Sequence, residues 1–187
     1  MTHFELQPDI SQLQQLAEDY FKDNPGELEI EARAFDAGKR IREGEYSITN
    51  LEAIVRWKSP RVLHYIGENS GEQIAIALPK ATTPQAAVSE ALEALIELRG
   101  VALPVASAIL TAIFPDRYTI IDFRALEALG HRPQDVKFYE GYLAFCKTLA
   151  DAGVIQPQPH YPAPTALRAL DRALWQWSAS QSKKPVE

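Results

Sequence analysis

The sequence predicts an all-α fold, and three observations support this class. Apolar residues recur at the three- and four-residue spacing of one helix face along nearly the whole chain. Caps, prolines and glycines mark helix starts and stops and leave short connections between the segments. The 187 residues are 46% hydrophobic and 24% charged, a composition typical of a folded protein that can bury a core. We therefore expect one compact all-α domain over residues 1–187, with about eight or nine helices.

Helix signals in the first half of the chain divide it into five segments. Thr49 or Asn50 is the expected cap of the third segment, and Pro60 is expected to kink or split it. Ser70 begins a capping-box pattern, although the alternation over 73–78 leaves a strand open as the alternative there. Pro84 stands where the first turn of the fifth segment is expected, and Gly100 just past its end. The expected segments are 9–22, 28–43, 51–67, 71–79 and 84–100.

Four further helical segments follow in the second half. Asp122 is the expected cap of a short helix that closes on Gly130, and a proline-rich loop precedes the last segment. The end of the chain, 180–187, is predicted to be a frayed tail. The expected segments are 104–114, 123–130, 138–152 and 165–178.

Acidic residues are concentrated at the start of the chain. The net charge is −6, from 25 acidic and 19 basic residues. The acidic helical segment 1–31 holds eight acids and one base, so residues 32–187 hold 17 acids and 18 bases. The acidity of the whole chain therefore does not exclude a polyanionic partner for the rest of it.

Several classes of protein are excluded or disfavoured by what the sequence lacks. Cys146 is the only cysteine, so an intrachain disulfide or a cysteine-based cluster is excluded, and we expect this thiol in the core. The four histidines show no metal-ligand spacing, and no metal or other cofactor is expected. No apolar run approaches the roughly 18 residues of a membrane span, and the start resembles no secretory signal. We expect a cytoplasmic protein without a membrane partner.

One stretch, residues 98–130, is more informative than the others. Gly100 ends one helix and Pro104 begins the next only four residues later. The turn between them exposes backbone N–H groups near a helix N-terminus, where the helix dipole favours an anion. Such a turn can bind a phosphate without lysine or arginine.

Residues 84–130 resemble the helix-hairpin-helix DNA glycosylases, the superfamily of endonuclease III and of the MutY-type and AlkA-type enzymes. Leu98, Gly100, Val101 and Ala106 stand at the hairpin positions. An apolar residue, an aspartate and an arginine follow at the family's spacing, here as Ile121, Asp122 and Arg124. The resemblance implies a DNA-binding hairpin and core over 84–130.

Three departures from the family narrow the activity that the resemblance implies. Ala102 replaces the second hairpin glycine, and the cysteines of the family's iron–sulfur cluster are missing. Pro104 stands where bifunctional members carry their Schiff-base lysine, so lyase chemistry by that route is excluded. The implied activity is therefore hydrolytic excision of a flipped base by a monofunctional enzyme, with Asp122 as the carboxylate.

The candidate site residues divide into three groups, each with a simpler alternative. Asp122 could be an ordinary helix cap, the stretch around Lys58 a solvated basic face, and Trp57 a core residue. A non-catalytic module that binds DNA or a protein partner is the alternative to the enzyme, and a chance resemblance in a helical interaction domain is the third interpretation. Beside the catalytic candidate Asp122, the candidates for DNA binding are Gly100, Val101, Ala102, Leu103, Ala106, Arg124, Lys58 and Arg61, and those for a base pocket are Trp57 and Tyr118, followed by Tyr161, Trp175 and Trp177. Arg168, Asp171 and Arg172 are interpreted as charge pairs that dock the last helix.

Overall fold

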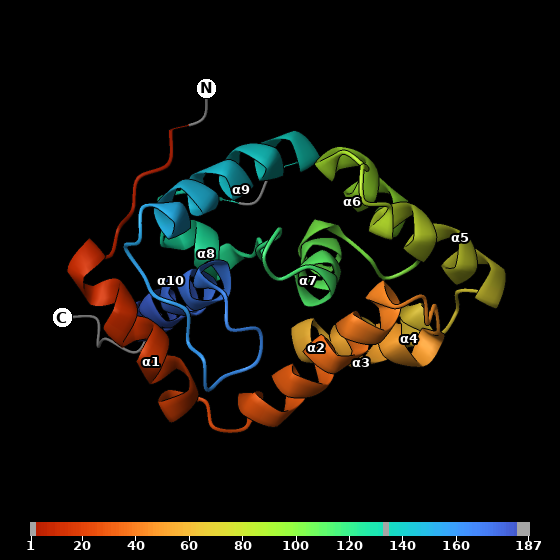
Figure 1. Ribbon diagram of the computed structural model, residues 1–187, viewed down its shortest axis with the longest axis horizontal. Coiled ribbons are helices and arrows are strands. Elements are labelled where there is room, and N and C mark those ends of the chain that lie inside the picture. The colour runs from red at the N-terminus through yellow and green to blue at the C-terminus, as the bar shows by residue number, and fades with distance from the viewer. Residues whose placement is uncertain (1–2, 133–134, 183–187) are drawn as a thin grey trace.

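Ten α-helices and two short 3-10 helices are the regular elements of the computed structural model, which describes residues 3–132 and 135–182 (Figure 1). These ranges contain no β-strand, so the predicted all-α class is confirmed. Within them, no helix combines the length and the apolar character needed to cross a membrane. The elements are η1 (Ile10–Gln12), α1 (Leu13–Asp23), α2 (Glu27–Arg42), α3 (Ile48–Lys58), η2 (Pro60–Val62), α4 (Leu63–Ile66), α5 (Gly71–Thr82), α6 (Val88–Ile96), α7 (Leu103–Ile113), α8 (Phe123–Glu127), α9 (Val136–Asp151) and α10 (Ala166–Ser182).

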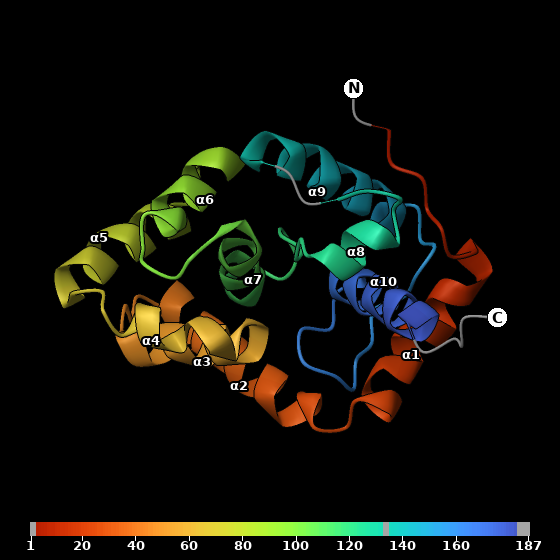
Figure 2. The same cartoon turned by 180° about the vertical axis from the view of Figure 1, so that it is seen from behind.

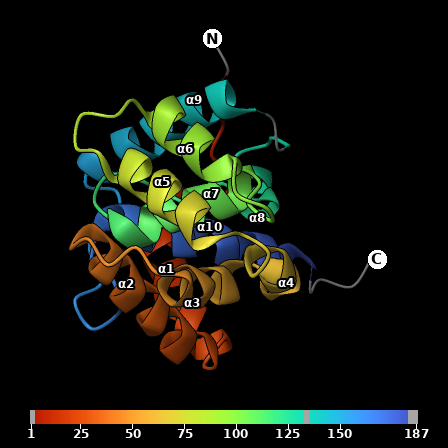
Figure 3. The same cartoon turned by 90° about the vertical axis from the view of Figure 1, so that its right-hand side faces the viewer.

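Helix α7 lies at the centre of the fold (Figures 1 and 2). All of its residues from 105 to 113 are buried. It packs against α2, α3 and α6, and Figure 3 shows it between an upper group of helices, α5, α6 and α9, and a lower group, α1, α2 and α3. The turn that precedes α7 is therefore anchored to the most enclosed helix of the protein.

At Gly38, helix α2 lies directly on the backbone of α7. A Cβ atom added to Gly38 would lie 2.1 Å from the carbonyl oxygen of Ala112 and 2.8 Å from the nitrogen of Ile113. Ala34 and Ala37, on the same helix, are fully buried. Small residues thus let α2 lie directly on the central helix, as close packing of two helix backbones requires.

Helix α1, which lies within the acidic segment 1–31, contributes side chains to the core. Helix α1 packs along α10 and buries Leu13 and Ala17 completely (Figure 1). At the end of α1, the side-chain amide of Gln176 donates a 2.6 Å hydrogen bond to Asp23. Packing and this hydrogen bond therefore join α1 to α10, although the two helices lie near opposite ends of the sequence.

The first residues of the helices show which of the predicted N-caps are present. Ser70 and Gln73 form the predicted capping box, and 71–82 is a helix, so the strand alternative is wrong. Helix α3 is capped by Ser47 rather than by Thr49 or Asn50, because the Ser47 hydroxyl accepts from the N–H of Asn50. Pro60 splits the segment, as predicted, into α3 and the short pair η2 and α4.

The start of α6 differs from its prediction. Pro84 does not lie in the first turn of a helix, because residues 83–86 form a turn in which the N–H of Ala86 donates to the carbonyl of Thr83 at 3.0 Å. The helix begins at Val88, and the Glu90 carboxylate accepts from the N–H of Ala87 at 3.1 Å. An acidic side chain inside the first turn replaces the missing cap.

The later helices follow the predicted positions closely. Helix α8 has the predicted Asp122 cap, and Gly130 has the positive φ of 69° typical of a residue that follows a helix, although α8 itself ends at Glu127. Helix α10 continues to Ser182, so the first residues of the segment 180–187 are helical rather than frayed. Residues 183–187 lie outside the described residues.

Candidate active site

Asp122 lies at the N-cap of α8, and its two carboxylate oxygens have different partners. Oδ1 accepts a 2.9 Å hydrogen bond from the N–H of Ala125, so the predicted cap is confirmed. Oδ2 forms a 2.5 Å ion pair with Nζ of Lys58, which is 64 positions earlier in the chain, at the end of α3. The cap therefore uses only one oxygen, and the other is bound to a cation from a distant helix.

The ion pair sets the charge of Asp122. Both side chains are mostly buried, with 16% of the Lys58 side chain and 12% of the Asp122 side chain exposed. Burial alone would raise the pKa of Asp122, but Lys58 and the N–H groups of Ala125 and Arg124 outweigh it and hold this pKa below its usual value. Asp122 is therefore a carboxylate at neutral pH.

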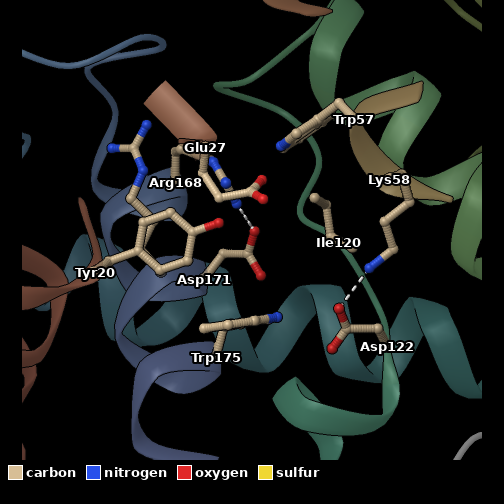
Figure 4. Close-up of a pocket in the computed structure, with 10 residues that line it drawn as sticks. Tyr20, Glu27, Trp57, Lys58, Ile120, Asp122, Arg168, Asp171 and Trp175 are labelled. Carbon is tan, nitrogen blue, oxygen red and sulfur yellow. Dashed lines mark hydrogen bonds and ion pairs between the residues drawn. The ribbon is translucent and has the colours of Figure 1, made fainter. Parts of the chain in front are cut away.

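A cavity of about 200 Å³ opens beside Asp122, and we call it the Asp122 cavity (Figure 4). Trp57 from α3 and Trp175 from α10 point into it, together with Tyr20 from α1 (Figure 4). Segments far apart in the chain thus build one aromatic and charged enclosure. Its lining residues are Tyr20, Glu27, Trp57, Lys58, Ile120, Asp122, Arg168, Asp171, Arg172 and Trp175.

A larger groove of about 750 Å³ runs past the hairpin turn, and we call it the hairpin groove. It shares Lys58, Asp122 and Trp175 with the Asp122 cavity, so Asp122 faces both spaces. A ligand that lay along the groove could place one of its parts in the cavity. The lining residues of the groove are Lys58, Ser59, Pro60, Arg61, Val62, Gly100, Ala102, Pro104, Val105, Asp122, Phe123 and Trp175.

Gly100 is required by the shape of the hairpin turn. Its φ of 82° lies in the left-handed region that favours glycine. A Cβ atom there would also lie 2.8 Å from Cβ of Tyr65 and 3.2 Å from the carbonyl oxygen of Val62. The turn therefore packs tightly against α4 and η2, and η2 forms the opposite wall of the hairpin groove.

The predicted DNA-binding residues separate into exposed and buried sets. Arg61 is exposed at the groove, and Gly100 and Ala102 line it. Val101 and Ala106 are buried in the core, while Leu103 is partly buried against it. The hairpin can thus present backbone to a ligand, but these three side chains support the fold.

Phe123 lines the hairpin groove, whereas the predicted DNA contact Arg124 does not line it and packs against two of its aromatic rings. The Arg124 guanidinium lies 5.0 Å from the ring centre of Phe123 and 4.9 Å from that of Trp175. It also donates a 3.3 Å hydrogen bond to the hydroxyl of Ser178. Phe123 is 61% exposed, so an uncovered aromatic ring stands next to Asp122.

The back of the Asp122 cavity is a buried charge network. Arg168 binds both oxygens of Glu31, at 3.0 and 2.7 Å, and also pairs with Asp171. Arg172 pairs with Glu31 and donates a 3.0 Å hydrogen bond to Gln158. The prediction that charge pairs dock the last helix is thus confirmed.

Sequence reasoning missed the position of Asp171 in the cavity. Burial raises the pKa of Asp171 to about 6, and Arg168 opposes this shift only in part. The helical spacing of Arg168, Asp171, Arg172 and Trp175 is a signal that could have placed all four on one face. The cavity thus contains three carboxylates: the pKa of Asp122 is lowered, whereas those of Asp171 and Glu27 are raised.

The remaining aromatic candidates lie elsewhere. Tyr118 is buried with its ring 6.3 Å from that of Phe114, and it lines neither the Asp122 cavity nor the hairpin groove. Tyr161 packs against Phe21 at a ring distance of 4.6 Å, and Trp177 is partly buried against the core. Trp57 and Trp175 are therefore the tryptophans that the fold brings to Asp122.

Comparisons with protein families, with curated proteins and with solved structures found no match to this chain.

Proposed function

We propose that this protein binds DNA and excises a base by hydrolysis, with Asp122 as the carboxylate that acts on the sugar. The observation that carries the proposal is the position of Asp122, which is mostly buried, paired with Lys58 and placed where the Asp122 cavity meets the hairpin groove. The resemblance of residues 84–130 to the helix-hairpin-helix glycosylases supports the same role for this aspartate.

Binding would begin along the hairpin groove. Ala102 caps α7 without a side-chain hydrogen bond, so the positive end of this eleven-residue helix is left to an outside anion. Arg61 supplies a cation on the opposite wall of the groove. These groups suit the phosphates of a DNA strand, which bind by charge and without regard to sequence.

Excision would then take place at the junction of the two spaces. A base is removed only after its nucleotide has left the stack, and the Asp122 cavity offers Trp57 and Trp175 as walls for it. Breaking the bond between base and sugar develops positive charge on the sugar, which the Asp122 carboxylate stabilises. The same carboxylate can accept a proton from the water that adds to the sugar, while Lys58 keeps it ionised and in place.

Asp122→Asn is expected to lower the rate of base excision by about 100-fold or more, because the amide can neither offset the charge nor accept a proton. The fold should be retained, since asparagine is a good N-cap. The measurement is single-turnover excision from duplexes that contain uracil, hypoxanthine, 8-oxoguanine or 7-methylguanine, with abasic sites revealed by strand cleavage in alkali.

Asp135→Asn is the matched control. Asp135 caps α9 through a 2.9 Å bond from the N–H of Phe138 and lines neither the Asp122 cavity nor the hairpin groove. Equal excision by wild type and Asp122→Asn would overturn the catalytic role of this aspartate. Absence of excision from all four duplexes by the wild type would favour the second function below.

A non-catalytic DNA-binding module is the second candidate. The observation that favours it is the Lys58–Asp122 ion pair itself, which neutralises the carboxylate and, with the bond to Ala125, satisfies it as a structural cap. Such a module would retain salt-dependent DNA binding through the hairpin groove while releasing no base.

Ala102→Asp is expected to weaken DNA binding by about tenfold or more, because it places a carboxylate at the turn where a phosphate would bind. Ala102 has an ordinary φ of −96° and is the N-cap of α7, so the substitution fits the fold without strain. Ala102→Asn adds the same shape without charge and should bind as the wild type does. Fluorescence anisotropy with an abasic-analogue duplex at two salt concentrations measures the effect. Equal binding by all three proteins would exclude the hairpin turn as the DNA contact.

A further inference from the structure

The carboxylate of Asp171 faces the Asp122 cavity with one oxygen uncommitted. Only 5% of its side chain is exposed. Oδ2 pairs with Nη1 of Arg168, while Oδ1 has no hydrogen bond from any residue that the structure describes. In Figure 4 this second oxygen is turned toward the side of the cavity where Trp175 and Asp122 lie. A nearly buried polar atom thus points into the space proposed for the base.

The partners of Arg168 explain why Asp171 is only weakly neutralised. Glu31 takes two of the three guanidinium nitrogens of Arg168, which leaves one nitrogen for Asp171. Glu31 also pairs with Arg172, so this one carboxylate binds both arginines of α10. Asp171 therefore pairs with a single nitrogen of Arg168, and Arg168 is also bound to Glu31.

The charged groups that surround Asp171 come from every element around the cavity. Burial raises its pKa to about 6, Arg168 and Lys58 lower it, and Asp122 and Glu31 raise it. Arg172, Glu27 and Tyr20 complete the set of titratable groups that line the cavity. Asp122 stays ionised beside Lys58, whereas Asp171 can hold a proton close to neutral pH. Two carboxylates with opposed environments are the usual arrangement for dividing acid and base work.

We propose that Asp171 is the proton donor to the departing base, so that the protein acts on neutral bases, which leave as anions unless they are protonated. This inference rests on the proposed function. The bond between C1′ and the base nitrogen breaks, its electron pair goes to the base, and the proton of Asp171 is transferred to a nitrogen or oxygen of the base. Water adds to C1′ and gives its proton to Asp122. The products are a neutral free base and an abasic sugar, and solvent returns the protons to their starting positions.

Asp171→Asn tests the role through the charge of the substrate. On duplexes with uracil or hypoxanthine, which are neutral, single-turnover excision should fall by about tenfold or more in the variant. On a duplex with 7-methylguanine, a cationic base that leaves without a proton, any excision should fall far less than on the neutral bases. The wild-type rate on the neutral base should decline above about pH 6, tenfold for each pH unit in the limit, and this decline should be absent from the variant. Equal rates and equal pH profiles on the neutral bases, or activity restricted to 7-methylguanine, would overturn the proposal.

A measurement without DNA separates this proposal from the proposed function. In protein labelled with ¹³C at aspartate Cγ, the signal that Asp171→Asn removes should titrate near pH 6, well above the ordinary midpoint of about 3.9. Asp122→Asn should lower this midpoint, because it removes a negative charge that faces Asp171.

A midpoint near the ordinary value for aspartate would overturn the proton-donor role of Asp171 even if Asp122 proves catalytic. A raised midpoint in a protein that excises no base would overturn both the enzymatic function and the donor role. Circular dichroism checks the fold of Asp171→Asn, in which Arg168 keeps its two bonds to Glu31.

Discussion

Glu31→Ala is expected to lower the free energy of unfolding by about 3–5 kcal/mol, because it leaves two buried guanidinium groups without their shared carboxylate. Glu31 is fully buried, and its oxygens accept from both Arg168 and Arg172. Asp171 would remain as the one carboxylate paired with Arg168. Urea denaturation followed by circular dichroism measures the loss. Since a whole domain is stable by only about 5–15 kcal/mol, this one substitution would remove a large share.

Glu29→Ala is the matched control on the same helix. Glu29 also pairs with an arginine, Arg33, but 76% of its side chain is exposed. An exposed pair of this kind contributes at most about 1 kcal/mol, because water and salt screen it. If Glu31→Ala lowers the free energy of unfolding no more than Glu29→Ala does, the two buried arginines can find other partners without Glu31. Glu31→Gln keeps the volume of the side chain and should fall between the two.

Gly38→Ala is expected to destabilise the protein by about 3 kcal/mol, although alanine is the better helix former. The added methyl group would lie 2.1 Å from the carbonyl oxygen of Ala112, so α2 and α7 must separate or bend. Neither helix has a flexible side chain at this contact that could move aside. Thermal and urea denaturation measure the change.

Gly26→Ala makes the same substitution where space is free. No atom lies within 4 Å of the position that its Cβ would take, and φ is −69°. We expect unchanged or slightly higher stability, by up to about 1 kcal/mol, since alanine restricts the unfolded chain. Similar stability of both variants would show that α2 does not approach α7 as closely as the structure indicates.

Local signals explain which parts of the fold were predictable. The capping box at Ser70 and the cap at Asp122 depend on residues three positions apart, and both are confirmed. The start of α6 was not predictable from Pro84, because a turn over 83–86 competes with a first helical turn that contains proline. At α3, three polar residues close together could each serve as the cap, and the backbone conformation selects Ser47.

Long-range contacts explain which parts of the site were not predictable. The spacing within residues 98–130 predicts the hairpin and Asp122, but the partner of Asp122 lies 64 positions away on α3. No local pattern distinguishes Lys58 from the neighbouring Arg56 and Arg61 as that partner. Helical periodicity places Asp171 beside Arg168. Only the folded chain shows that two of the three guanidinium nitrogens of Arg168 donate to Glu31.

The pairing of α1 with α10 has a consequence for how the chain folds. Asp23 meets Gln176 across 153 positions, and Glu31 meets Arg172 across 141. Contacts of such high sequence separation slow folding, since a long loop must close before they contribute. During synthesis, α1 leaves the ribosome long before α10 exists, so its apolar face stays exposed to chaperones or to aggregation until α10 is made. The Asp122 cavity, which needs residues from α1, α2 and α10, is therefore assembled at the last stage of folding.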